Sequence, residues 1–117
     1  MVDLRERRAR YVARLDDGLN RLVAQLSAMP EVRRVSVFGS YARGRRDLAT
    51  DLDVLVILDT AEPMPERLAR LYRLLDAGVD LDLVAWTPAE HERMLGRPFG
   101  RTIAAEEQVL YEARFDR

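Results

Sequence analysis

Asp51 and Asp53 are the residues in this sequence whose type and spacing most directly suggest chemistry. They stand at the start of an apolar run over residues 52–58 that is typical of a β-strand. Residues two apart on a strand point to the same face, so the two carboxylates should lie side by side. Like charges at that distance repel and raise the pKa of one group unless a cation neutralises them. Mg²⁺ or Mn²⁺ would do so, since hard cations bind carboxylate oxygens and keep several waters.

A third carboxylate is needed from a neighbouring strand, because a two-metal site takes more than one pair of acids. The segment 79–84 reads VDLDLV and places Asp80 and Asp82 on one face. Either could reach the pair. Asp82 is the better candidate because it lies deeper within the apolar run.

Gly39 and Ser40 are candidates for holding phosphate. They end a strand predicted over residues 32–38, and a short helix could start after them at residues 41–43. Backbone N–H groups exposed at such a turn can bind phosphate oxygens, and glycine permits a close approach of the backbone to a ligand. The Ser40 hydroxyl could donate to the same group. Further positive charge for a triphosphate could come from three arginines: Arg43, Arg45 and Arg46.

The elements that must position these residues alternate between helix and strand. Residues 3–27 form an amphipathic pattern with apolar residues three and four apart. Thr87 to Glu90 resembles a capping box with proline at the first helical position. The other expected elements are strands at 52–58, 79–86 and 109–111, and helices from Pro65 to a stop at Gly78, from 88 to about 95, and over 98–106. This order predicts an α/β (α+β) fold with a mixed sheet of about four strands and helices packed on it.

Composition narrows the class of protein. The chain has 117 residues, which suggests one domain. No apolar run approaches the roughly 20 residues of a membrane span, and the N-terminal residues do not resemble a secretion signal. With no cysteine, disulfides and thiolate chemistry are excluded. We therefore expect a cytoplasmic protein with no membrane partner.

The charged residues exclude further kinds of site. All 19 basic residues are arginine, which rules out a P-loop lysine or a Schiff-base lysine. His91 is the sole histidine, so metal sites with two histidines are impossible, and we expect this side chain to be exposed to solvent. The net charge of −1 predicts no strong binding of nucleic acid.

Taken together, these motifs resemble the minimal nucleotidyltransferase family of the polymerase-beta-like superfamily. Its signature is Gly-Ser, ten residues, then Asp-x-Asp, which Gly39-Ser40 and Asp51-Leu52-Asp53 match without a gap. The longer form G-S-x-A-R-G stands here at residues 39–44. Thr50 replaces the serine that the family often has before the first aspartate. A later V-D-L-V element is matched by residues 81–84, which supports Asp82 over Asp80.

The resemblance implies a minimal nucleotidyltransferase fold in a single domain over 1–117, with an N-terminal helix (1–29) and a catalytic core (30–112). It implies two Mg²⁺ ions on Asp51 and Asp53, with Asp82 completing the site beside the acceptor hydroxyl. Gly39, Ser40 and Arg43 would bind the nucleotide, with ATP as the substrate. These residues would transfer AMP without a covalent enzyme intermediate.

The family also implies a partner, since stand-alone members are commonly encoded beside a small helical HEPN-type toxin. There they act as antitoxins that add AMP to a tyrosine of the toxin. Two alternatives remain: a non-catalytic antitoxin or binding subunit of the same fold, and a subunit of a small-molecule (antibiotic) nucleotidyltransferase. The sequence leaves the acceptor open, and an oligomer is compatible with it.

Overall fold

The computed structural model describes residues 3–114, which form helices and strands in alternation. The elements are α1 (Leu4–Ser27), β1 (Val32–Phe38), α2 (Gly39–Ala42), β2 (Leu52–Leu58), α3 (Met64–Leu74), β3 (Leu81–Trp86), α4 (Pro88–Met94), α5 (Pro98–Glu106) and β4 (Gln108–Glu112). The predicted α/β class and most of the predicted elements are confirmed.

The strands form one mixed sheet in the order β3-β2-β1-β4. The central strand β1 is antiparallel to both β2 and β4, whereas β2 and β3 run parallel. In this register Asp53 of β2 lies between Phe38 of β1 and Asp82 of β3. The sheet therefore places acids of two adjacent strands side by side.

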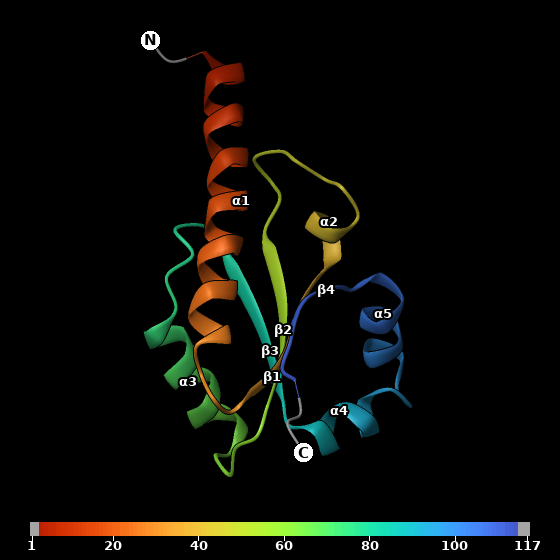
Figure 1. Ribbon diagram of the computed structural model, residues 1–117. Coiled ribbons are helices and arrows are strands. Elements are labelled where there is room, and N and C mark those ends of the chain that lie inside the picture. The colour runs from red at the N-terminus through yellow and green to blue at the C-terminus, as the bar shows by residue number, and fades with distance from the viewer. Residues whose placement is uncertain (1–2, 115–117) are drawn as a thin grey trace.

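Helices cover both faces of the sheet (Figure 1). The larger core joins α1 and α3 to alternate β2 residues such as Val54 and Val56. The other β2 face, with Leu55 and Ile57, packs with Trp86 and with Ile103 of α5. By strand alternation, Asp53 belongs to this second face.

The N-terminal half of α1 projects beyond the end of the sheet (Figure 1), which makes the molecule elongated at 54 × 29 × 29 Å. The Asp3 side chain caps the helix by accepting from the backbone N–H of Arg5. Residues 3–10 are exposed, and the buried stripe of α1 begins only at Leu15. Within residues 3–114, no helix combines the length and the apolar character that crossing a membrane requires.

Two predicted boundaries near the site were wrong. Helix α3 ends at Leu74 rather than at Gly78, because Leu75 already has an extended backbone with ψ of 137°. The Asp76 carboxylate then accepts from the N–H of Gly78, which stabilises a turn in place of a further helical turn. As a result β3 begins at Leu81, and Asp80 precedes the strand.

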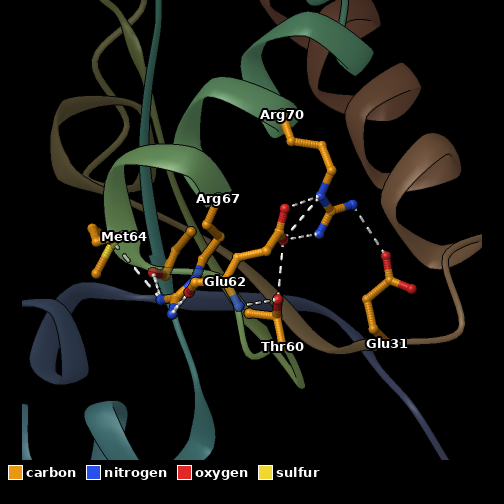
Figure 2. Close-up of polar contacts among 7 residues, drawn as sticks. Glu31, Thr60, Glu62, Met64, Arg67 and Arg70 are labelled. Atoms are coloured by element: carbon orange, nitrogen blue, oxygen red, sulfur yellow. Dashed lines mark hydrogen bonds and ion pairs between the residues drawn. The ribbon is translucent and has the colours of Figure 1, made fainter.

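A buried arginine joins α3 to the end of β3. Arg67 is 3% exposed and donates to the backbone carbonyls of Glu62 and Ala85 and to the Glu90 carboxylate. Figure 2 shows Arg67 beside a second network, in which Arg70 pairs with Glu62. Glu90 also completes the predicted capping box at the start of α4. These contacts fix the end of the sheet opposite the acids.

Candidate active site

Asp53 and Asp82 meet on adjacent parallel strands, at the end of the sheet where β2 and β3 begin. Asp53 is half-buried, and Asp82 is exposed. Asp51 is half-buried and lies immediately before β2 rather than within it. The three predicted acids thus come from one edge of the sheet, with Asp53 in the middle.

The surroundings of Asp53 oppose the negative charge of its carboxylate. Burial raises the pKa of its carboxyl group, and repulsion from Asp82 and then Asp51 raises it further. The guanidinium of Arg43 partly opposes these effects. A nearby cation would relieve the repulsion and favour the ionised form of Asp53.

Asp80 and Asp82 have different surroundings, although they are only two residues apart. Asp82 acts on Asp53, whereas Asp80 contributes to the raised pKa of Tyr11, together with burial and Asp51. Burial makes the largest contribution to the pKa of Tyr11. Asp80 is tied to β2 through its backbone, whose carbonyl accepts from the N–H of Leu52 at 3.1 Å. Asp82, and not Asp80, is the residue of β3 in register with Asp53.

Gly39 lies against the Asp53 carboxylate. Its φ of +71° is in the left-handed region that favours glycine. A Cβ at this position would lie 2.2 Å from Oδ2 of Asp53, closer than real Cβ contacts. The predicted phosphate-binding turn and the predicted metal-binding acid are therefore in direct contact, and glycine is needed for that contact.

Glu106 is a residue of this site that the sequence patterns did not indicate. It is the last residue of α5, and its Oε2 accepts from the backbone N–H of Gly39 at 3.1 Å. Its Oε1 pairs with Arg43 at 2.8 Å. No local signal could reveal these contacts, because residues 39 and 106 meet only through the packing of α5 against α2.

The remaining predicted phosphate-side residues divide into two groups. Ser40 is half-buried beside Gly39, and Arg43 is exposed apart from its contact with Glu106. Arg45 pairs instead with Asp47 at 2.8 Å, and Arg46 stacks over the ring of Tyr41. Of these three arginines, Arg43 is therefore the one that shares a hydrogen-bond partner, Glu106, with Gly39.

The connection before Asp51 is anchored to α1. The Tyr11 hydroxyl donates to the backbone carbonyl of Thr50 at 2.7 Å, and the Thr50 side chain is fully buried. The Thr50 hydroxyl accepts a hydrogen bond from the backbone N–H of Asp47 and donates one to the Asp47 carboxylate, both at 3.1 Å. Thr50, the departure from the family's serine, thus organises the loop that positions Asp51.

The acids have the chemistry of a Mg²⁺ site without its final geometry. They offer hard carboxylate oxygens, which are the ligands that Mg²⁺ prefers. A bound cation would also relieve the repulsion between them. Yet among residues 3–114, no three Asp, Glu, His or Cys side chains are arranged so that they could hold a metal ion by themselves. Magnesium often binds through one or two carboxylates together with substrate phosphates and water. The residues fit a metal that arrives with a nucleotide.

His91 does not lie on an open surface, contrary to expectation. It is half-buried and stacks on Trp86, with ring centroids 6.2 Å apart. Burial lowers the pKa of its imidazole, and Arg34 lowers it further. His91 and Arg34 also line a cavity of about 540 Å³. Trp86 itself is buried.

Comparison with known proteins identifies the family that this part of the chain matches. Residues 19–114 match the family model for a nucleotidyltransferase domain. No curated protein matches the sequence. Among solved structures, a putative nucleotidyltransferase from Sulfolobus solfataricus is similar with a TM-score of 0.63 and 18% identity, covering 90% of this chain and 86% of that one.

Two toxin–antitoxin structures are also similar in fold. One is the complex of a tri-AMPylated Shewanella oneidensis HEPN toxin with an MNT antitoxin, with a TM-score of 0.53 and 17% identity. The other is a mutant of the MntA–HpeT toxin–antitoxin, with a TM-score of 0.51 and 17% identity. Each match covers 85% of this chain and 73% of the other. At these identities the likeness concerns the fold.

Proposed function

The chain belongs to the nucleotidyltransferase domain family, and we propose that it transfers AMP from ATP to a hydroxyl group in a reaction that depends on Mg²⁺. One observation carries the proposal: Asp53 contacts Gly39 on one side and is in register with Asp82 on the other. The turn that we propose to bind phosphate therefore lies beside a pair of acids that repel each other, at one end of the sheet.

Each residue has a part that follows from its place. The N–H of Gly39 and the Ser40 hydroxyl would hold triphosphate oxygens, and Arg43 would neutralise part of their charge. Asp51, Asp53 and Asp82 would hold Mg²⁺, which would screen the phosphates and polarise the reacting oxygens. Mn²⁺ could take the same positions, because it accepts the same oxygen ligands.

The transfer is a displacement at the α-phosphorus of ATP. The acceptor oxygen forms a bond to that phosphorus while the bond to the departing pyrophosphate breaks. Asp82, the exposed acid at the edge, is placed to help the acceptor hydroxyl lose its proton. Positioning and charge neutralisation would supply the rate, since no residue needs to form a covalent bond with the nucleotide.

We further propose that the acceptor is a tyrosine of a HEPN-type toxin and that this chain is its antitoxin. Support comes from the similar fold of the antitoxin that is bound to a tri-AMPylated HEPN toxin. The projecting part of α1 offers a docking surface, because Arg5 and Arg8 are exposed there and lie one helical turn apart on one face. No side-chain partner for these two arginines lies within residues 3–114. A patch of this kind suits an acidic face of a protein partner.

The test is to incubate the protein with ATP labelled at the α-phosphate, Mg²⁺ and the product of the neighbouring gene, which the proposal expects to be a HEPN-type toxin. Label should appear on a tyrosine of that protein, and toxicity should fall in proportion. If the toxin is neutralised without being labelled, the chain is a binding subunit of the same fold instead. If label appears on small hydroxyl compounds such as aminoglycosides but not on the protein, the small-molecule alternative is correct.

A further inference from the structure

Both oxygens of the Glu106 carboxylate are engaged at the place where the proposed function puts the triphosphate. One accepts from the Gly39 N–H at 3.1 Å, and the other pairs with Arg43 at 2.8 Å. These are two of the groups that a phosphate would use. A carboxylate and a phosphate oxygen are both anionic acceptors, so they compete for the same donors.

Nothing local to α5 explains why an acid stands at its last position. A negative charge at the C-terminal end of a helix is disfavoured by the helix dipole, and the last turn of α5 contains no basic residue. The side chain of Glu106 is 23% exposed, so the charge also loses part of its hydration. Its contacts with Gly39 and Arg43 are the ones that offset these costs.

We propose that Glu106 is an internal competitor that occupies the nucleotide site until a triphosphate displaces it. The inference rests on the proposed function and adds a regulatory contact to that site. In the closed state Arg43 is neutralised and the Gly39 N–H is satisfied. When the triphosphate binds, the Glu106 side chain leaves and both donors turn to phosphate oxygens.

The packing around Glu106 lets its side chain move while the backbone stays in place. Glu107, the next residue, is anchored to Arg34. Gln108 donates to the backbone carbonyl of Ala42 at 3.0 Å, which holds the start of β4 against α2. Opening therefore requires a rotamer change of one partly exposed side chain and no movement of α5.

The test is the affinity for a non-hydrolysable ATP analogue with Mg²⁺, measured by calorimetry on the full chain. Glu106→Ala removes the competitor, and Glu106→Gln keeps its shape without its charge. Glu112→Gln is the matched control, because it removes the same charge from a side chain that is 64% exposed on β4. If the contact keeps the site closed nine-tenths of the time, its loss tightens binding about tenfold.

The expected result is that Glu106→Ala tightens binding by about an order of magnitude, Glu106→Gln by less, and Glu112→Gln very little. The amide signal of Gly39 should shift in both Glu106 variants without added ligand. Unchanged or weaker binding in Glu106→Ala would overturn the inference while leaving the proposed function intact. Absence of binding in every variant, wild type included, would overturn the proposed function and the inference that rests on it.

Discussion

Replacing Gly39 by alanine should disable the site through a single methyl group. The Cβ would lie 2.2 Å from Oδ2 of Asp53, and ordinary contact begins at 3.4 Å. Ordinary contact is restored only if the carboxylate oxygen moves by 1.2 Å, the difference between these two distances. A misplacement of about 1 Å can reduce an enzymatic rate by about 100-fold, so we expect a loss of that order in AMP transfer.

Gly44→Ala provides the matched control. Gly44 also has a positive φ, of +96°, but a Cβ there would meet nothing within 4 Å. Both variants should lose about 1–2 kcal/mol of stability from left-handed backbone strain. For a domain of this size that lowers the melting temperature by about 4–8 °C.

Transfer rates measured well below both melting temperatures separate strain from displacement of Asp53. Gly44→Ala should keep most of its activity, whereas Gly39→Ala should lose nearly all of it. Equal loss in the two variants would show that the contact between Gly39 and Asp53 does not matter for the chemistry.

Three further predictions address stability and the partner. Asp53→Asn should raise the melting temperature of the metal-free protein near neutral pH, because a raised pKa means that the ionised Asp53 destabilises the fold. That gain should vanish on acidification below about pH 4, the carboxyl pKa of the unfolded chain, and a gain that persists there would contradict this cause. Arg67→Met should lower the free energy of unfolding by about 3 kcal/mol in urea titrations, because it removes the cation paired with Glu90 and the donor to the Ala85 carbonyl. A loss below about 1 kcal/mol would show that these bonds contribute little. Replacing Arg5 and Arg8 by glutamate, which reverses their charge, should weaken partner binding and reduce its salt dependence. ATP binding should stay unchanged, and an unaltered affinity for the partner would exclude α1 as the docking surface.

Much of the fold could be predicted from the sequence because its signals are local. The apolar run over 52–58 and the proline at residue 98 mark β2 and the start of α5 directly. The end of α3 could not be placed, because Leu75 continues the apolar pattern of the helix while its backbone is already extended. His91 was misjudged for a similar reason, since its burial depends on contact with Trp86 of another element.

The predicted site residues were found by a pattern of spacing, and the structure adds what spacing cannot express. The distance of Gly39 from Asp53 depends on the pairing of β1 with β2. The approach of Glu106 depends on where α5 ends relative to α2. Thr50 looked like a minor departure from a motif, yet its burial and bonds to Asp47 organise the loop.

Metal-dependent transfer of AMP by Asp51 and Asp53 is tested most directly by single-turnover transfer of label from ATP to the proposed HEPN-type partner. The measurement compares wild type with the double variant Asp51→Asn, Asp53→Asn. We expect transfer that requires Mg²⁺ or Mn²⁺ and is abolished by chelation. The double variant should bind the partner normally and transfer nothing. Transfer that persists in the double variant, or that proceeds at the same rate without a divalent metal, would contradict the proposed metal-dependent mechanism.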